Sequence, residues 1–367
     1  MLTHGIDSRL PRLGEAVSFL ESPSQPRALE KTRVTAITVQ NRKPIAPVPC
    51  NCTGKRRGSE PSRYGADVDH DELHRLRAEN EHLRHQLADL QRKTGPYPLG
   101  HFHSPIPDLE EVQRDADKVY VPDDRDLPGI DRDEARQWAV LNELARYAGQ
   151  ENFARHATAD RRYYWDNRVF QYADAFVLYA MLRRLQPRRW IEIGSGFSSA
   201  ALLDALDRHP EITTRLLFVD PDSARVHALL RPADHARCEY LQQRVQDVPI
   251  ARFDELGAGD VLFIDSSHVS KVASDVNWLF FEVVPRLRPG VIVHVHDIPP
   301  AFEYSREWIE AGWAWNEAYL VRAFLMFNQA FRFEIHPAFL AARDPAACMR
   351  LLPECPGVGT SLWLRRV

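Results

Sequence analysis

The residues of this chain that are best placed for chemistry lie in a short segment, 190–199. An apolar run there ends in Glu192, and Gly194 and Gly196 follow just before a helix-like pattern begins. This order predicts a strand, a tight turn and a helix N-terminus, which is where a doubly wound α/β sheet binds its cofactor. Ser199 breaks the dinucleotide pattern G-x-G-x-x-G at its third glycine, and the Glu192 carboxylate would repel a pyrophosphate. The segment therefore favours a cofactor that carries positive charge.

These residues resemble motif I of the class I S-adenosylmethionine-dependent methyltransferases, with Ser198 at a position where many members have a third glycine. S-adenosylmethionine carries an ammonium and a sulfonium group, and a carboxylate at Glu192 suits both. The resemblance extends from about residue 166 to the C-terminus, and the first hundred residues lie outside it. It implies that the cofactor is bound by Glu192, Gly194, Ser195 and Gly196.

Further cofactor contacts are expected after the second and third strands. Asp220 ends the apolar run 215–219, and its two carboxylate oxygens can accept hydrogen bonds from both ribose hydroxyls. Asp222 is instead a candidate N-cap of the next helix. The resemblance implies that Gln246 and Asp247 meet the adenine amino group, and a solvated loop is the alternative for both.

Acids and histidines follow the next two apolar runs of the chain. Asp265 and His268 come directly after the fourth run, and His296 and Asp297 close the fifth. Because the carboxyl ends of parallel strands meet at one edge of a sheet, these side chains are expected to lie close together. Two carboxylates with imidazoles beside them suit Mg²⁺ or Mn²⁺. His294 lies inside the fifth run and is expected to be a hydrogen-bonded core histidine.

The order Asp265-x-x-His268 followed by His296-Asp297 resembles a methyltransferase subfamily that includes antibiotic-pathway and sugar O-methyltransferases. The resemblance implies that Asp265 and Asp297 bind Mg²⁺ and that His268 is the general base, with His296 as second choice. Asp265 also belongs to the expected cofactor contacts. The alternatives are an N-cap role or a structural hydrogen bond to the following helix for His268, and carboxylates that bind only substrate or backbone amides. Ile298 departs from the catechol-type pattern, in which an Asn ligand follows the second acid.

The periodicity of the chain predicts the elements that position these residues. Alternating strands and helices indicate a doubly wound, Rossmann-like α/β sheet. The resemblance implies that it is the seven-stranded methyltransferase sheet, in a domain over 186–367 that follows a linker and helical cap over 95–185. Lys271 and Asp275 are expected four residues apart on the helix after His268. The expected helices include 134–148 and 170–185, and the expected strands are 190–193, 215–219, 238–241, 261–264, 291–296, 331–335 and 361–364.

The first part of the chain has a different character. Residues 1–69 are rich in Pro, Ser, Arg and Gly, and we expect them to be disordered. Residues 70–94 predict a coiled-coil helix, because leucines recur at spacings of three and four around Asn80. The pattern indicates a parallel homodimer through 72–93, and a single amphipathic helix packed on its own chain is the alternative. The charges that support pairing are Glu72, Glu79, Arg77 and Arg84.

Composition narrows the class of protein. A net charge of −4 provides no basic field for a nucleic-acid backbone, so no nucleic-acid partner is expected. We find no run of about 18 apolar residues, which argues against a membrane span. The N-terminus lacks the layout of a signal peptide, and Cys50-x-Cys52 has no second pair that would complete a zinc site. We expect a cytoplasmic protein with reduced thiols.

Aromatic residues crowd the segment after the fifth strand, and they predict a lid over a small-molecule or saccharide acceptor. The core of a helix pair is the alternative for the same residues, and the aromatic run 163–167 is expected to close the other side. The expected function is O-methylation of a saccharide or small natural product. A non-catalytic scaffold assembled through the coiled coil and an NAD-dependent enzyme are the alternatives. The aromatic residues of the segment include Tyr304, Trp308, Trp313, Trp315 and Tyr319.

Overall fold

The computed structural model describes residues 70–95, 97–222, 224–353, 355, 357 and 359–367. The disorder predicted for 1–69 lies outside these residues. The expected helix over 70–94 is present as one continuous element, α1 (His70–Thr94). Among the described helices, none is both long enough and apolar enough to cross a membrane.

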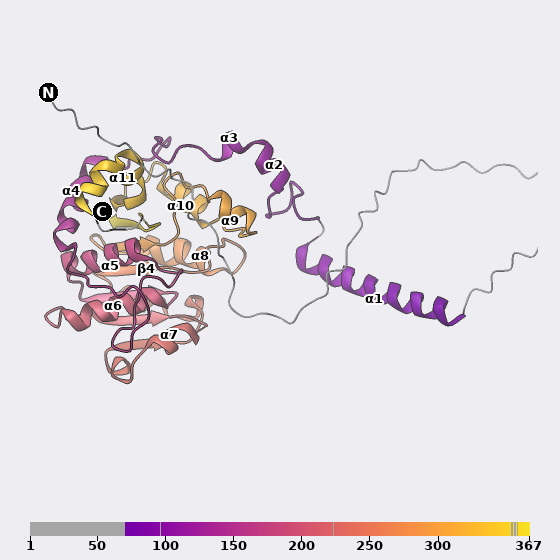
Figure 1. The fold of residues 1–367 in the computed structure, drawn as a ribbon, viewed down its shortest axis with the longest axis horizontal. Coiled ribbons are helices and arrows are strands. Elements are labelled where there is room, and N and C mark those ends of the chain that lie inside the picture. The colour runs from indigo at the N-terminus through magenta and orange to yellow at the C-terminus, as the bar shows by residue number, and fades with distance from the viewer. Residues whose placement is uncertain (1–69, 96, 223, 354, 356, 358) are drawn as a thin grey trace, which may run out of the picture. The chain divides into compact units, whose positions relative to one another are not determined.

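A seven-stranded sheet forms the centre of the fold (Figure 1). Its order is β3-β2-β1-β4-β5-β7-β6, with the first five strands of the chain parallel and β7 antiparallel between β5 and β6. This confirms the predicted fold class. Predicted and observed strands differ by at most two residues at their ends. The strands are β1 (Arg189–Ile193), β2 (Arg215–Val219), β3 (Cys238–Leu241), β4 (Val261–Ile264), β5 (Ile292–Val295), β6 (Phe331–Ile335) and β7 (Leu362–Arg366).

Successive side chains of a strand point to opposite faces of the sheet, and both faces are buried. Trp190 packs with residues of α4, α5, α6 and α11, whereas Ile191 packs with residues of α10 and of the π-helical turn Leu279–Val283. All other described helices are shorter than α1. The helices after α1 are α2 (Leu109–Arg114), α3 (Ala116–Val119), α4 (Glu134–Leu144), α5 (Tyr172–Leu185), α6 (Phe197–Arg208), α7 (Ala224–Leu229), α8 (Asp275–Trp278), α9 (Arg306–Glu310), α10 (Glu317–Leu325), α11 (Pro337–Arg343) and α12 (Pro345–Leu351).

One prediction about the helix after β4 is wrong. Residues 265–274 form a loop, and α8 begins only at Asp275, with the Ser274 hydroxyl as its N-cap. Lys271 and Asp275 therefore do not share a helix turn. Asp275 instead accepts hydrogen bonds from the backbone N–H and the hydroxyl of Ser267, at 2.9 and 2.5 Å. The loop is closed by these contacts rather than by an ion pair along a helix.

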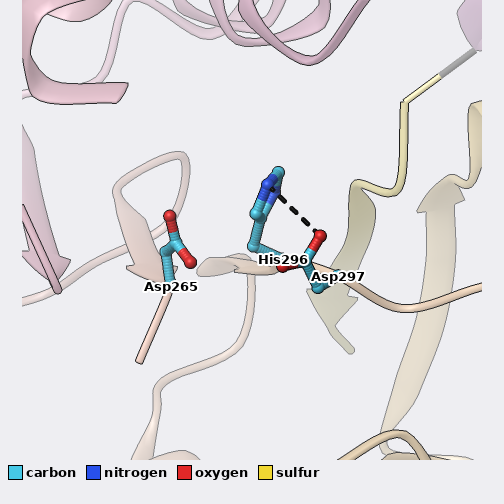
Figure 2. A group of neighbouring side chains, drawn as sticks. All are labelled: Asp265, His296 and Asp297. Carbon is cyan, nitrogen blue, oxygen red and sulfur yellow. Dashed lines mark ion pairs between the residues drawn. The ribbon is translucent and has the colours of Figure 1, made fainter. Parts of the chain in front are cut away.

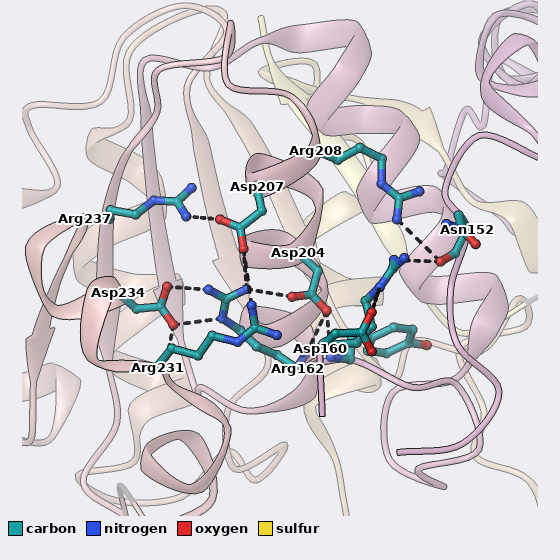
Figure 3. Close-up of polar contacts among 11 residues, drawn as sticks. Asn152, Asp160, Arg162, Asp204, Asp207, Arg208, Arg231, Asp234 and Arg237 are labelled. Carbon is teal, nitrogen blue, oxygen red and sulfur yellow. Dashed lines mark hydrogen bonds and ion pairs between the residues drawn. The ribbon is translucent and has the colours of Figure 1, made fainter. Parts of the chain in front are cut away.

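Arg162 joins the segment before α5 to α6 and to the turn Pro232–Ala236 (Figure 3). Its guanidinium forms ion pairs with Asp204 and Asp207 at 2.7 Å and with Asp234 at 2.6 Å. Burial lowers the pKa of Arg162, but the three carboxylates outweigh it and raise the pKa, so the group stays charged. The neighbouring Tyr163 is only 1% exposed. This residue of the aromatic run 163–167, which was expected to close one side of the acceptor site, therefore belongs to the core.

Candidate active site

The glycine turn after β1 brings three loops together. Gly194 has a φ of +80°, and a Cβ at this position would lie 1.7 Å from the backbone oxygen of Asp265. Only glycine satisfies both the backbone conformation and the close approach. The N–H of Gly194 also donates to the carbonyl of Val219, and the N–H of Ser195 donates to Asp220 at 2.8 Å. The loops after β1, β2 and β4 therefore meet at the carboxyl edge of the sheet.

Glu192 is fully buried beneath the first turn of α6. Its Oε1 accepts hydrogen bonds from the hydroxyls of Ser198 and Ser199, each at 2.7 Å, whereas Oε2 has no partner among the described residues. Burial raises the pKa of Glu192 to about 8, although the two hydroxyl donors act in the opposite direction. The full negative charge expected at this position is therefore reduced at neutral pH.

Asp220 lies at the end of β2 with both carboxylate oxygens engaged by backbone. Oδ2 accepts from Ser195, and Oδ1 accepts from the N–H of Asp222 at 2.8 Å. Each oxygen keeps lone pairs for a further donor. Asp222 accepts a 3.4 Å hydrogen bond from Ala224, the first residue of α7, which fits the N-cap alternative.

The two residues expected near adenine lie in different surroundings. Gln246 donates from Nε2 to the carbonyl of Ala273 at 2.9 Å, and its buried Oε1 has no partner among the described residues. Asp247 is exposed and forms a bidentate ion pair with Arg244, with both contacts at 2.9 Å, which lowers the pKa of its carboxyl. Gln246 is thus the better candidate, because Asp247 already has a surface partner.

Acids and histidines converge at the ends of β4 and β5, and Figure 2 shows three of them, Asp265, His296 and Asp297. Ligand atoms of Asp265, His296 and Asp297 all lie within 4.8 Å of one another. His268 completes the group, since its Nε2 lies 3.4 Å from Asp265 Oδ1 and 3.6 Å from Asp297 Oδ2. His296 Nε2 lies 3.6 Å from Asp297 Oδ1. The structure therefore brings together all four residues that the sequence placed at this edge.

Two of these residues have strained backbones. His268 has a φ of 59° and Asp297 a φ of 54°, which is the left-handed region that favours glycine. Non-glycine residues keep such a conformation where surrounding contacts enforce it, and functional sites are where this strain concentrates. The carbonyl of His268 accepts hydrogen bonds from the N–H groups of Asn316 and Glu317, at 3.0 and 3.1 Å. The first turn of α10 thereby holds the histidine in place.

Glu317 is a site residue whose role the sequence did not indicate. Its side chain is fully buried, and a 2.9 Å hydrogen bond joins its Oε2 to Nδ1 of His268. Burial lowers the pKa of His268, but the interactions with Asp265 and Glu317 outweigh it and raise the pKa well above its ordinary value. Since 49 residues separate the two side chains, no local spacing could have paired them.

Asp297 is held from a third element. The hydroxyl of Thr360 donates to Asp297 Oδ1 at 2.8 Å. The buried Asp174 of α5 in turn accepts from the N–H groups of Thr360 and Ser361, at 3.0 and 3.1 Å, and from the Ser361 hydroxyl. No local spacing in the sequence could have indicated this contact, because 186 residues separate Asp174 from Thr360.

His294 lies in the core, as predicted, but the predicted hydrogen bond to another described residue is lacking. It stacks on Phe263 with ring centroids 3.7 Å apart, and neither ring nitrogen has a partner among the described residues. Burial holds the pKa of His294 well below its ordinary value. His294 is therefore neutral and does not supply a ligand at the edge of the sheet.

Tryptophans form a cluster beside His268. The ring of Trp315 lies 4.4 Å from the His268 ring, and Trp313 lies 4.6 Å from Trp315. Trp313 is 42% exposed, whereas Tyr304 is 2% exposed and its hydroxyl accepts the N–H of Ala318. The segment thus contains both a core part and an exposed aromatic part, and only the latter suits a lid.

Comparisons with known proteins find a methyltransferase domain in this chain. The family described as "Methyltransferase domain" matches residues 191–298. An uncharacterized protein of Archaeoglobus fulgidus is 30% identical over 179 residues, which cover 46% of this chain and 77% of the relative. The O-methyltransferase TomG from Streptomyces achromogenes, involved in tomaymycin synthesis and solved with S-adenosylmethionine, is 16% identical, with coverage of 65% and 91% and a TM-score of 0.34. A Podospora anserina methyltransferase bound to S-adenosylhomocysteine is 12% identical, with coverage of 74% and 99% and a TM-score of 0.37.

Proposed function

We propose that this chain, which belongs to the S-adenosylmethionine-dependent methyltransferases, transfers the methyl group to a hydroxyl oxygen of a small molecule. The observation that carries the proposal is His268, whose ring links a buried carboxyl on one side to two carboxylates on the other. A histidine held at both nitrogens is suited to proton transfer. A saccharide is the acceptor class that we would test first.

The residues of the glycine turn fit the cofactor. Glu192 Oε2 and Gln246 Oε1 are buried acceptors that lack partners in the described structure, and Gly194 lets the turn pack closely against the backbone of Asp265. We assign Glu192 to the ammonium end, Asp220 to the ribose and Gln246 to adenine. When bound, S-adenosylmethionine supplies an electrophilic methyl carbon on a sulfonium. A cationic ligand would also favour the ionised form of Glu192, whose pKa is raised without one.

The edge of the sheet fits a divalent cation. Asp265 and Asp297 offer oxygen ligands, and His296 offers a nitrogen within the same 4.8 Å group. We therefore assign His296 as a third ligand rather than as the second-choice base. A nitrogen donor moves the preference from Mg²⁺ toward Mn²⁺ and later first-row metals. When bound, such a cation lowers the pKa of a coordinated hydroxyl.

His268 acts as the general base in this proposal once its ring has lost the extra proton that its raised pKa favours, so turnover is expected to rise with pH. A hydroxyl held at the Asp265–Asp297 edge gives its proton to Nε2 of His268, because Nδ1 is engaged by Glu317. The hydroxyl oxygen forms the new bond to the methyl carbon as the bond from that carbon to sulfur breaks. Glu317 positions the ring and keeps Nε2 directed at the two carboxylates. Much of the rate in such a displacement comes from alignment, which a fixed base and fixed carboxylates supply.

The tryptophans beside His268, of which Trp313 is exposed and Trp315 partly buried, support a ring-shaped acceptor. Trp313 and Trp315 lie side by side, and Trp315 packs against the base itself. Flat aromatic faces pack against the apolar faces of sugars and other cyclic molecules. An acceptor that packs on these rings would lie beside His268, because the Trp315 ring is 4.4 Å from the His268 ring.

The test is transfer of labelled methyl from S-adenosylmethionine to a panel of glycosides, phenols, amines and thiols. Labelled ethers should form, and His268→Asn should lower turnover by about 100-fold or more while the affinity for S-adenosylhomocysteine changes less than about threefold. His227→Asn, an exposed histidine of α7, is the matched control and should keep full turnover. Labelling of amines or thiols alone would disprove the choice of oxygen, and full turnover of His268→Asn would disprove the choice of base.

A further inference from the structure

The long helix α1 carries an apolar seam that a single chain leaves exposed. Leu76, Leu83 and Leu87 are 50, 54 and 55% exposed, although leucine is among the residues most often buried. Their spacings of seven and four residues place them at the core positions of a heptad repeat, with Leu76 and Leu83 at d and Leu87 at a. A partner of the same periodicity would bury this seam.

Asn80 is the polar residue of the series. It occupies the a position between Leu76 and Leu83, where an asparagine reduces stability but specifies two strands in one register. An asparagine at this position can hydrogen-bond to the same residue of an identical helix in register, whereas a leucine from a displaced register would leave it unpaired. The seam therefore favours a second copy of itself.

The charges beside the seam determine the direction of pairing. Glu72 and Glu79 occupy g positions, and Arg77 and Arg84 occupy the e positions five residues further on. In a parallel pair each glutamate faces an arginine of the other helix, which gives two Glu–Arg pairs along each side of the coiled coil. In an antiparallel pair g faces g and e faces e, so glutamates would oppose glutamates. Only the parallel arrangement is complementary.

We propose that α1 binds α1 of a second copy of this chain in a parallel, in-register, two-stranded coiled coil. The inference rests on α1 alone and is independent of the proposed function. Both helices end at Thr94 on the same end of the coil, so the two catalytic domains follow from one end. Two active sites would then be tethered to one stalk, which raises the effective concentration of the second site for an acceptor with more than one reactive hydroxyl.

Sedimentation of the full chain tests the interface. We expect a mass twice the 42.2 kDa of one chain at micromolar concentration. Leu83→Asp should raise the dimer dissociation constant by about 100-fold or more, whereas Ala78→Asp, at the f position on the opposite side of the helix, should leave it within about threefold. A monomeric wild type, a trimer, or a dimer that survives Leu83→Asp would overturn the proposal. Unchanged binding of S-adenosylhomocysteine by both variants would show that the catalytic domain remains folded.

A charge exchange and a crosslink test the direction. Glu79→Arg should weaken the dimer, and the double variant Glu79→Arg/Arg84→Glu should restore it, because the complementary pairs are re-formed with reversed sign. In a Cys50→Ser/Cys52→Ser background, Leu76→Cys should form a disulfide-linked dimer under mild oxidation that the background protein lacks, since equivalent d positions meet only in the parallel register. Absence of that crosslink, or no rescue by the double variant, would overturn the parallel arrangement.

Discussion

Glu334 of β6 offers the most direct test of the electrostatics of this fold. Its carboxylate is fully buried and contacts Arg136 of α4 at 3.0 Å, Arg184 of α5 at 2.6 Å and Arg365 of β7 at 2.8 Å. Burial alone would raise the pKa of Glu334, but the three guanidinium groups lower it from 4.5 to about 2. Glu334→Gln removes the charge, keeps the volume and leaves three arginines around a neutral amide.

The magnitude follows from the pKa difference. A change from 4.5 in the unfolded chain to about 2 in the folded protein corresponds to about 3 kcal/mol of stability at neutral pH. Because the folded pKa is the lower one, this contribution is complete above pH 4.5 and is lost as the pH falls toward 2. At pH 3 less than about half of it should remain. The loss of a partner in a buried ion pair is known to cost a similar amount.

Urea denaturation of wild type and Glu334→Gln provides the measurement. The difference in the free energy of unfolding should be about 3 kcal/mol at pH 7 and should narrow steadily below pH 4.5. Glu282→Gln is the matched control, because Glu282 is 47% exposed and lies 3.8 Å from a single arginine, so its effect should stay under about 0.5 kcal/mol. A difference below about 1 kcal/mol at pH 7, or one that does not change between pH 7 and pH 3, would refute the reasoning.

The remaining predictions concern the site itself. Gly194→Ala should abolish binding of S-adenosylhomocysteine in calorimetry, because its Cβ would lie 1.7 Å from the Asp265 carbonyl. Gly259→Ala, with a similar φ of +84° but nothing within 4 Å of its Cβ, should bind normally and cost only about 1 kcal/mol of stability. Thr360→Val should weaken Mn²⁺ binding by about 10-fold without changing cofactor affinity, since it removes the hydrogen bond to Asp297. Thr214→Val, which removes a comparable hydrogen bond to Pro187, is the control, and equal Mn²⁺ affinity in the two variants would contradict the role of Thr360.

Much of the fold could be predicted because its strands are short apolar runs. Each of the first five parallel strands is followed within a few residues by a charged or polar residue. The apolar run predicts the strand, and the polar residue after it predicts a site residue at the carboxyl edge of the sheet. Asp220, Asp265 and Asp297 were found in this way. The loop 265–274 was mistaken for a helix because Lys271 and Asp275 have helical spacing, whereas Ser267 competes for the Asp275 carboxylate. Side chains that bond to nearby backbone commonly displace a helix turn in this manner.

The partners of the site residues could not be predicted, because they reach the site only through tertiary packing. Glu317 and Asp174 are carboxyl groups on helices, and in the sequence they resemble ordinary helix residues. In the structure both are buried, one against His268 and the other against the segment that carries Thr360. A buried acid is costly unless it is paired, so its retention at such a place is itself a signal of function or of strict positioning.

The two buried acids, Glu317 and Asp174, act on different parts of the site. Both position reactive residues and are not themselves reactive groups. Glu317 fixes the ring of His268, whereas Asp174 acts through Thr360 on the carboxylate of Asp297. His268 and Asp297 both have left-handed backbones, which neither residue would keep without such contacts. The geometry at the edge of the sheet is therefore imposed by α10 and α5, on opposite faces of the sheet, rather than by the strands that carry the reactive groups. Motifs at the strand ends therefore identify the reactive groups, but they do not identify the contacts from α5 and α10 that fix the geometry of those groups.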